Sequence, residues 1–431
     1  MARSITRRRF LGQTAMGGAA AAWALGSLPG LAEETAPDKV VIGVMGLSRG
    51  SSLAVSFAEQ PGVEVKYLCD TDAGRAQAVA QMFTTKVKNA QTPELVADFR
   101  KILDDPSVHA LICAAPNHWH APATILACSA GKHVYVEKPC CHNPREGEWM
   151  VAAARKYNRA VQMGSQRRSS PGTRAAMRKL HDGVIGHVYL ARSWYTSARG
   201  SIGKGQPAPV PPQLDYDLWQ GPAPRRPYLD NRIPYNWHWF WHWGNGELGN
   251  NGVHTIDLCR FGLQADFPVR VTSSGGRYHF DDDQETPDTH TVCLEFEGKR
   301  QIVWEGRSCN KHDSDFIVFY GDQGTLELDG DGTFRVFDAQ DKKVEEVPSP
   351  SQGDEEHIAD FLRAIRRGEP LALNAEIAEG YKSTLLCHLG NIAHRTGRTL
   401  NCHPADGHIA GDHEAMQFWG REYEAGWEPQ V

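Results

Sequence analysis

The chain has 431 residues, of which 41% are apolar and 23% charged, and its formal net charge is −6 at pH 7. This length and composition are enough to bury the cores of two packed domains. Because there is no basic surplus, the sequence argues against nucleic acid or an anionic membrane surface as a partner.

The N-terminal segment has the pattern of an export signal. Three arginines at residues 7–9 precede Phe10 and Leu11, a Gly/Ala-rich stretch follows, and small residues lie near Ala32. This stretch is shorter than the ~20 residues of a membrane span, so we expect no span in the mature chain. TRRRFL resembles the twin-arginine signal, which directs folded proteins across a membrane. We therefore expect residues 1–32 to be removed and the protein to be periplasmic or otherwise exported.

Residues 38–161 alternate short apolar runs with helical patterns. This alternation favours a parallel, doubly wound sheet, that is, a Rossmann dinucleotide-binding domain. The predicted strands are residues 39–46, 63–72, 110–116, 133–139 and 160–168, and the predicted helices are residues 51–60, 73–83, 121–131 and 145–158.

After about residue 165 the hydrophobic period changes to two, which predicts an antiparallel sheet. We assign residues 162–431 to an α+β domain with a large, mainly antiparallel sheet and C-terminal helices. Its predicted strands are residues 187–196, 268–280, 289–298, 300–307, 315–330 and 332–339, and its predicted helices are residues 172–186, 355–368 and 375–397. A Pro/Gly-rich loop spans about residues 199–236.

The predicted turn between the first strand and the first helix reads GVMGLSRG, residues 43–50. A dinucleotide site needs glycines at this turn, because the backbone must approach the pyrophosphate at a helix N-terminus. Gly46 fits the first position of GxGxxG, Ser48 occupies the second, and Gly50 falls one residue early. A glycine turn without a ligand is the alternative.

An acidic residue strengthens the nucleotide interpretation. Asp70 closes the second predicted strand, 20 positions after Gly50, where a carboxylate would bind a ribose 2′-hydroxyl. The same carboxylate would repel a 2′-phosphate, so NAD is favoured over NADP, although Arg75 nearby keeps NADP open.

Two longer segments carry a family resemblance. The first is APNHWHAPATILACSAGKHVYVEKPCC (115–141), and the second joins DLWQGPAPRRPY (217–228) to NWHWFWHWGNGELGNNGVHTIDL (236–258). In combination they resemble the glucose–fructose oxidoreductase / inositol dehydrogenase / MocA family. The resemblance implies a Rossmann domain followed by an α/β domain whose open sheet often mediates oligomers, so we expect a homo-oligomer.

By position, the resemblance implies that Lys138 is the active-site lysine, which contacts the nicotinamide ribose and the substrate hydroxyl. It implies likewise that His254 is the catalytic histidine. The family's usual aspartate, four residues before that histidine, falls on Asn250. An amide accepts hydrogen bonds but adds no negative charge and would not raise the histidine's pKa. This departure leaves the type of reaction open.

The residue types favour catalysis without the family. Asn250, His254 and Asp257 are spaced i, i+4, i+7, so on a helix they share one face. Histidine suits general base work near neutrality, and Lys138 at a strand end can polarise an alcohol or carbonyl oxygen. The alternatives are a structural histidine, a surface lysine before a turn proline, and a structural Asp257.

The remaining site residues follow from these placements. The residues expected to contact the dinucleotide are Gly46, Ser48, Arg49, Gly50, Asp70, Pro116, Asn117, His120, Glu137 and Lys138. The residues expected to contact the substrate are Arg168, Trp239, Trp241, Glu247 and Asp257. Arg167 is the alternative to Arg168, and both could instead be solvated arginines of a loop.

Tryptophans at positions 237, 239, 241 and 243 alternate with other residues. If the stretch is extended, four indoles share one face and offer a stacking surface for a sugar ring. Packing of the long loop against the core is the alternative, and we expect both, with one or two rings reaching the pocket. The histidine pairs 118/120 and 238/242 suggest a metal, but no acid or cysteine at ligand spacing completes either set, so we expect none.

The sequence therefore predicts an exported NAD(H)-dependent oxidoreductase that acts on a secondary hydroxyl of a sugar, glycoside or cyclitol. Because an exported enzyme has no NAD pool to exchange with, we expect tightly bound cofactor. An NAD-dependent glycosidase that works by transient oxidation and elimination is the main alternative. A non-catalytic sugar-binding protein is a further one.

Overall fold

The structure is a computed structural model that describes residues 39–88, 91–312 and 314–431. The predicted signal peptide, residues 1–32, lies outside this part of the chain. Among the helices of the described residues, none is both long and apolar enough to cross a bilayer.

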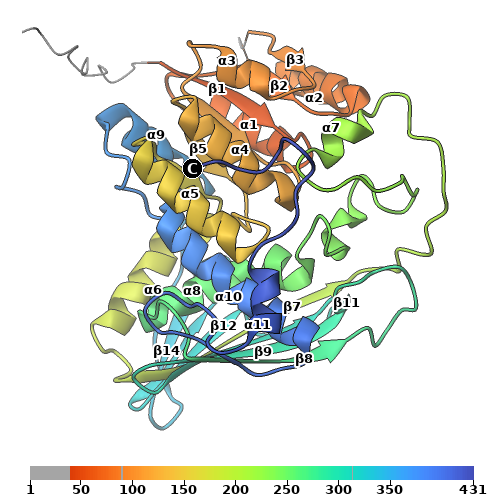
Figure 1. Cartoon of the computed structure of the whole chain (residues 1–431). Helices are drawn as coiled ribbons and strands as arrows, with labels where there is room; N and C mark the ends of the chain where they lie inside the picture. The colour runs from red at the N-terminus through yellow and green to blue at the C-terminus, as the bar shows by residue number, and fades with distance from the viewer. Residues whose placement is uncertain (1–38, 89–90, 313) are drawn as a thin grey trace, which may run out of the picture. The chain divides into compact units, whose positions relative to one another are not determined.

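The first sheet has six parallel strands in the order β3-β2-β1-β4-β5-β6 (Figure 1). Its strands are β1 (Val40–Met45), β2 (Val63–Cys69), β3 (Glu94–Val96), β4 (Ala110–Cys113), β5 (His133–Val136) and β6 (Val161–Met163). Every residue of β1 is buried, as expected of a central parallel strand covered on both faces. The predicted Rossmann fold is confirmed. The strand order reverses between β1 and β4, where ligands of such sheets bind.

The helices of this domain are α1 (Arg49–Ala58), α2 (Ala73–Lys86), α3 (Arg100–Asp104), α4 (Asn117–Ser129) and α5 (Pro144–Lys156). Helix α4 begins earlier than predicted and contains Pro122. Because proline has no N–H, the carbonyl of His118 lacks a helical donor. Arg421 Nη2 donates to that carbonyl over 2.6 Å, so the C-terminal tail is bound to α4.

The second sheet is mixed, with the order β15-β14-β13-β12-β7-β10-β9-β8-β16 and with β11 paired to β7. Its strands are β7 (Val188–Ala198), β8 (Arg270–Gly276), β9 (Thr289–Phe296), β10 (Arg300–Arg307), β11 (Cys309–Asn310), β12 (Ile317–Gly321), β13 (Gly324–Leu328), β14 (Phe334–Asp338), β15 (Lys343–Val347) and β16 (Leu400–Asn401). All neighbours are antiparallel except β7 and β10. The predicted large, mainly antiparallel sheet is confirmed.

Helices α6 (Pro171–His181), α8 (Val253–Leu263) and α10 (Ile377–Thr396) pack on the second sheet. In Figure 1, α8 and α10 lie between this sheet and the Rossmann domain. Helix α10 contacts α5 and β6 of the Rossmann domain as well as β8 and β9. One buried helix therefore ties the two sheets together.

Helix α9 (Asp354–Arg367) follows the second sheet in sequence but packs on the first. Its Phe361 meets the rings of Phe57 and Tyr135, with centroids 6.2 and 6.1 Å apart. The Rossmann core is thus completed by residues near the end of the chain.

Short elements connect the rest of the described chain. They are α7 (Tyr216–Gln220), α11 (His413–Met416), the 3₁₀ helices Gln166–Ser169, Asn236–Trp239 and Gln417–Trp419, and the π-helical turn Leu248–Gly252.

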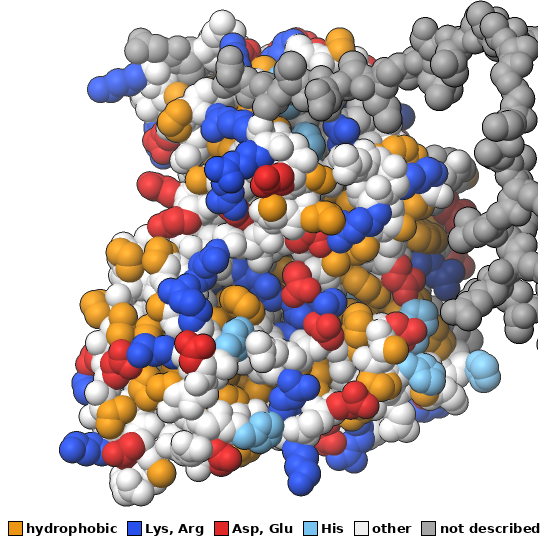
Figure 2. Space-filling view, turned by 90° about the vertical axis from the view of Figure 1, so that its left-hand side faces the viewer, with side chains coloured by type: hydrophobic (Ala, Val, Ile, Leu, Met, Phe, Trp, Pro, Cys, Tyr) orange, Lys and Arg blue, Asp and Glu red, His pale blue; other side chains and the backbone are white. Residues whose placement is uncertain are grey.

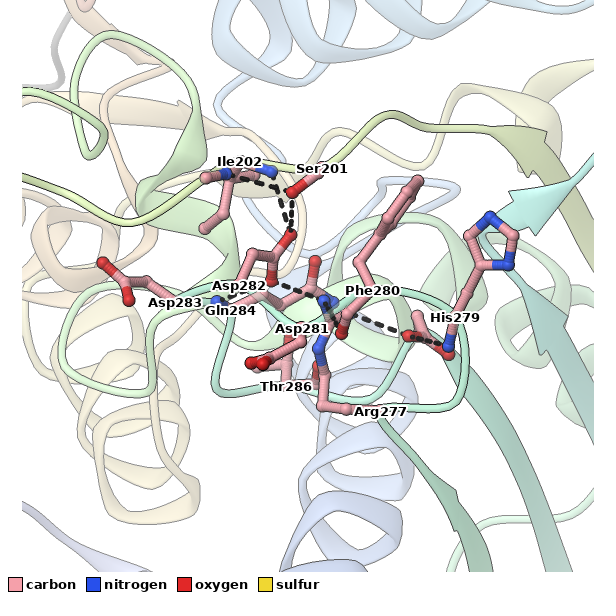
Figure 3. Close-up of polar contacts among 12 residues, drawn as sticks. Ser201, Ile202, Arg277, His279, Phe280, Asp281, Asp282, Asp283, Gln284 and Thr286 are labelled. Carbon is pink, nitrogen blue, oxygen red and sulfur yellow. Dashed lines mark hydrogen bonds and ion pairs between the residues drawn. The ribbon is translucent and has the colours of Figure 1, made fainter.

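The loop after β7 is held by an acidic segment between β8 and β9 (Figure 3). Asp282 accepts hydrogen bonds from Ser201 Oγ and Ile202 N, both over 2.9 Å, and pairs with Arg277 at 2.5 Å. Asp283 accepts from Gly205 N over 2.7 Å. These contacts replace the regular pairing that a Pro/Gly-rich segment cannot make.

The face shown in Figure 2 carries Lys/Arg and Asp/Glu side chains interspersed with hydrophobic ones. It has no continuous basic surface, which agrees with the net charge of −6.

Candidate active site

A cavity of about 550 Å³ opens at the carboxyl ends of β1, β2, β4 and β5. Its other walls come from α7, the segment around Tyr235 and the turn that leads into α8. The cavity therefore lies at the position where the strand order of the first sheet reverses.

At one end of this cavity, the turn from β1 into α1 is shaped for an anion. Gly46 has φ +83°, and a Cβ there would lie 2.5 Å from the backbone N of Ala115. Only glycine fits this conformation and this close approach. Ser48, the N-cap of α1, makes no side-chain cap, and the first turn contains no acid. The free N–H groups of the helix start and its dipole are thus available to a pyrophosphate.

Asp70 stands at the end of β2 and lines the same cavity. Its buried carboxylate accepts hydrogen bonds from Leu47 N over 2.8 Å and from Asp72 N over 2.9 Å. Arg75 lies 3.6 Å from it. Each carboxylate oxygen keeps a free lone pair, so Asp70 can accept further bonds from ribose hydroxyls. The helix start and this carboxylate together fit an adenine dinucleotide.

Glu137 and Lys138 follow β5 directly, and both line the cavity. Glu137 is buried and accepts from Arg49 Nε over 3.3 Å and from Gln166 Nε2 over 3.4 Å. These contacts hold the strand end in place, so the next residue projects toward the opposite wall.

The Lys138 ammonium is fixed by one residue. Nζ donates to the carbonyl oxygen of Asn250 over 2.8 Å and to its Oδ1 over 3.0 Å. An ammonium has three N–H groups, so one remains for another acceptor in the cavity. Burial lowers the pKa of Lys138 below its usual value, against the opposing effect of Glu137 and Glu247.

His254 lies near the start of α8 and lines the cavity together with Asn250. Its Nδ1 is buried and has no hydrogen-bond partner among the described residues. Burial first, and then the charges of Lys138 and Arg167, lower the pKa of His254 well below its usual range. The imidazole is therefore neutral at neutral pH and able to accept a proton.

Asp257 does not share the cavity face of Asn250 and His254, so the alternative of a structural Asp257 holds. Asn250 lies in the π-helical turn Leu248–Gly252, which precedes α8 and changes the rotation per residue. Asp257 is buried away from the cavity, where both of its oxygens accept from Arg168 Nε over 2.9 and 2.8 Å. Ser383 Oγ adds a bond of 2.6 Å.

The predicted substrate contact of Arg168 is not made, because its guanidinium pairs with the buried Asp257. The neighbouring Arg167 lines the cavity instead, with Nε bonded to Gly330 O over 3.0 Å. The 3₁₀ turn Gln166–Ser169 sends the two arginines in different directions.

The tryptophan run is not extended and does not form one indole face, whereas the expectation that one or two of its rings reach the pocket is met by Trp237. Residues Asn236–Trp239 form a 3₁₀ helix followed by turns, so the alternation of an extended strand is absent. Trp237 lines the cavity, and its ring stacks on His238 with centroids 3.6 Å apart. Trp243 is fully buried against Trp219.

Trp239, Trp241 and Glu247 were also predicted to contact substrate, but none lines the cavity. Trp239 is buried beneath the guanidinium of Arg199, which lies 4.7 Å above its ring. Trp241 lies under Arg395 at 5.0 Å. Glu247 is buried and pairs with Arg199 Nε at 2.6 Å. Stacking on arginine and ion pairing hold these side chains within the protein.

The expected cofactor residues collect around the cavity, except Gly50, which is buried beneath the turn. Pro116, Asn117 and His120 line it at the start of α4. The His120 ring lies between the carbonyl oxygens of Pro139 and Ala115, at 2.6 and 2.7 Å. Its nitrogens therefore contact backbone atoms, and the ring joins the ends of β4 and β5.

Several cavity residues were not predicted as site residues. Trp219 lies in the segment that carries the family resemblance, so its motif could have indicated it. The same holds for His238, which lies in the second part of that resemblance. Tyr235 comes from the long loop, Gln352 from the turn before α9, and Asp354 is the first residue of α9. No local pattern marks these three, because the tertiary fold alone brings them to the site. No three His, Cys, Asp or Glu side chains of the described chain converge as metal ligands.

Comparison with known proteins agrees with this geometry. The model "Oxidoreductase family, NAD-binding Rossmann fold" matches residues 39–165, and the model "Oxidoreductase family, C-terminal alpha/beta domain" matches residues 192–428. The first domain is thus an NAD-binding Rossmann domain.

Individual relatives are distant. The chain is 28% identical over 192 residues to levoglucosan dehydrogenase of Pseudarthrobacter phenanthrenivorans, which covers 42% of each protein. It is 30% identical over 176 residues to a glycosyl hydrolase family 109 protein of Saccharopolyspora erythraea, with 39% of this chain and 37% of that protein covered. The chain therefore matches less than half the length of these two relatives.

A solved levoglucosan dehydrogenase in complex with NADH and levoglucosan has the same fold. The TM-score is 0.66 at 19% identity, and the alignment covers 84% of this chain and 99% of that one.

Proposed function

The chain belongs to the glucose–fructose oxidoreductase / inositol dehydrogenase / MocA family of oxidoreductases, and on that premise we propose that it oxidises a secondary hydroxyl of a sugar, glycoside or cyclitol. The observation that carries the proposal is the convergence of Lys138, Asn250 and His254 on the cavity that the nucleotide-binding turn also lines. A relative named levoglucosan dehydrogenase supports a carbohydrate substrate.

Each side chain has one task in the proposed reaction. Bound NAD supplies a hydride acceptor. The free N–H of Lys138 holds the alcohol oxygen and stabilises the charge that grows on it. His254, neutral because its pKa is depressed, accepts the hydroxyl proton. Asn250 orients the ammonium through its two acceptor oxygens.

We propose NAD rather than NADP as the preferred cofactor, because Asp70 places a carboxylate at the end of β2. A 2′-phosphate beside that carboxylate would be repelled, and Arg75 is already engaged by it. Titration of the purified protein with both cofactors tests this proposal. Tighter binding of NADP would contradict it.

A glycosidase that uses the same oxidation transiently is the second candidate. It is supported by the glycosyl hydrolase relative and by Asn250, since the chain lacks the carboxylate expected at that position. Incubation with aryl glycosides without added NAD separates the two functions. Release of the phenol favours the glycosidase, whereas a stable keto-glycoside favours the oxidoreductase.

We also propose that the protein is exported through the twin-arginine pathway with its cofactor already bound. The proposal rests on the N-terminal TRRRFL motif and on the folded state of passengers of that pathway. Mass spectrometry of protein purified from the exported fraction should find nicotinamide dinucleotide. Protein found only in the cytoplasm would contradict the proposed export. Exported protein without nicotinamide would contradict the proposal that the cofactor is already bound.

A further inference from the structure

A second cavity of about 400 Å³ lies beyond one wall of the active-site cavity. The wall contains Asn117, which lines the first cavity, and Asn245, which lines the second. The Nδ2 of Asn117 donates to the Oδ1 of Asn245 over 2.9 Å. The remaining walls come from the turn before α5, the segment around Arg226, helix α10 and the C-terminal tail.

Three of the residues that line this second cavity carry buried nitrogen atoms with no hydrogen-bond partner in the described structure. They are Nδ1 and Nε2 of His142, Nδ2 of Asn143 and Nη1 of Arg421. Asn143 is only 5% exposed. Native proteins rarely leave such groups unpaired, and a cluster of them needs a partner that the chain does not supply.

Each of the three residues has at least one N–H group that lacks an acceptor. Asn143 Oδ1 caps α5 by accepting from Glu146 N over 3.1 Å, so its amide nitrogen remains. Arg421 donates through Nε to Glu146 and through Nη2 to His118 O, so Nη1 remains. A neutral His142 contributes one further N–H. The missing partner is therefore an acceptor.

The charges around this cavity favour an anionic acceptor. Its lining includes the four arginines Arg225, Arg226, Arg395 and Arg421 but only one acid, Glu422. Arg421 is paired with Glu146, and Arg226 lies 4.0 Å from Glu285.

Arg395 forms no ion pair with a described residue. It lies instead between the rings of Trp241 and Phe418, at 5.0 and 4.0 Å. The stacked rings fix the plane of its guanidinium, and its positive charge interacts with Glu285 without forming an ion pair with it. This residue therefore adds to the anion preference of the cavity.

A cation is not supported, although three histidines line this cavity. His242 Nε2 contacts Pro224 O at 2.8 Å, and His388 Nε2 contacts Cys141 Sγ at 3.5 Å. These contacts direct the two rings to separate partners. No set of three possible metal ligands occurs in the part of the chain that the structure describes.

We propose that the second cavity binds a small oxyanion, the carboxylate or phosphate group of a metabolite, through the amide of Asn143 and the guanidinium groups of Arg421 and Arg395. Its volume suits a small metabolite rather than a macromolecule. This inference goes beyond the oxidation chemistry and does not depend on it.

Calorimetric titration of the purified protein tests the proposal. Inorganic phosphate and gluconate are the two probes, and sorbitol is the uncharged counterpart of gluconate. We expect at least one anion to bind and sorbitol not to bind at this site. Binding of phosphate alone identifies a phosphate ligand, and binding of gluconate alone identifies a carboxylate.

The decisive variant is Asn143→Asp, which keeps the helix cap but replaces the free donor with a negative oxygen. We expect anion binding to weaken at least roughly tenfold, as for a lost charged hydrogen bond. Asn401→Asp adds the same charge on β16 outside the cavity and should bind anions like the wild type. Arg226→Gln, which changes a partly exposed side chain, should also weaken binding. The proposal would be overturned if neither phosphate nor gluconate bound. It would also be overturned if Asn143→Asp bound the anion with the affinity of the wild type.

Discussion

Asn250 stands where the family resemblance implies an aspartate. Its two oxygens hold the Lys138 ammonium, while the nearest negative charges come from Glu137 and Glu247. The amide thus orients the lysine without adding charge, and burial keeps the lysine's pKa below its usual value. The reactivity proposed for the site depends on how burial and the charges of Glu137 and Glu247 together set the pKa of Lys138.

Restoring a carboxylate with Asn250→Asp should raise the pKa of Lys138. An opposite charge at hydrogen-bond distance shifts a pKa by about one to three units, so the alkaline limb of kcat/KM should move upward by a comparable amount. The pH dependence of substrate oxidation measures this shift. Asn401→Asp is the matched control, and an unmoved alkaline limb in Asn250→Asp would contradict the assigned contact.

The pKa of His254 should set the acid limb of the pH profile of kcat/KM. The base acts when it is neutral, and its pKa lies well below the usual 6.5. Acidification from neutrality to pH 6.5 should therefore leave kcat/KM nearly unchanged, and the loss should begin only at lower pH. A midpoint at or above pH 6.5 in steady-state oxidation rates would show that another group, or an unshifted histidine, is the base.

The segment 236–263 contains backbone irregularities that a sequence pattern cannot predict. The spacing of Asn250 and His254 correctly predicted that both face the site. It could not reveal the π-helical turn before α8, nor the burial of Asp257 in its pair with Arg168. The alternating tryptophans likewise suggested a strand, whereas turns disperse their rings. Backbone irregularities of this kind are set by tertiary packing, which local periodicity does not contain.

Asp282 is one of the acidic side chains that hold the loop after β7 (Figure 3). Asp282→Asn should weaken its bonds to Ser201, Ile202 and Arg277, because bonds to a charged group contribute about 1.5–3 kcal/mol each. We expect faster cleavage of the segment 199–206 in limited proteolysis. The control is Asp281→Asn, whose side chain is 99% exposed and whose ion pair with a described residue is to Lys204. Equal cleavage rates in the two variants would refute this anchoring role.

For the whole molecule, the sequence predicted the two sheets but not their connection. Alternating strands and helices indicated the Rossmann domain, and the period-two runs indicated the second sheet. The return of α9 to the first core and the binding of the C-terminal tail to α4 left no local signal. The parallel pairing of β7 with β10 was also unpredictable, because period-two patterning does not distinguish strand direction.

Buried histidines make the stability of the whole protein sensitive to acid. Burial lowers the pKa values of His290 and His388 to about 3, below the usual 6.5. The unfolded state therefore binds more protons below pH 6.5, and stability present above that pH is lost on acidification. Linkage gives about 2 kcal/mol per histidine by about pH 5.

Thermal unfolding between pH 7.5 and 5 measures this effect. His290→Gln should flatten the dependence of Tm on pH, whereas His413→Gln, at an exposed position, should not. A wild-type Tm that rises or stays constant on acidification would contradict the prediction.

We propose above all that Lys138 and His254 promote oxidation of a carbohydrate hydroxyl by NAD bound in the cavity. Rapid mixing of the NAD⁺-loaded protein with a panel of sugars, glycosides and cyclitols, followed by nicotinamide absorbance, tests it most directly. We predict single-turnover reduction of bound nicotinamide in the wild type. Lys138→Met should still bind NAD but react at least about 100-fold more slowly, as expected when an electrostatic contact to the reacting oxygen is lost. Reduction at the wild-type rate in Lys138→Met, or no reduction by any compound of the panel, would contradict the claim.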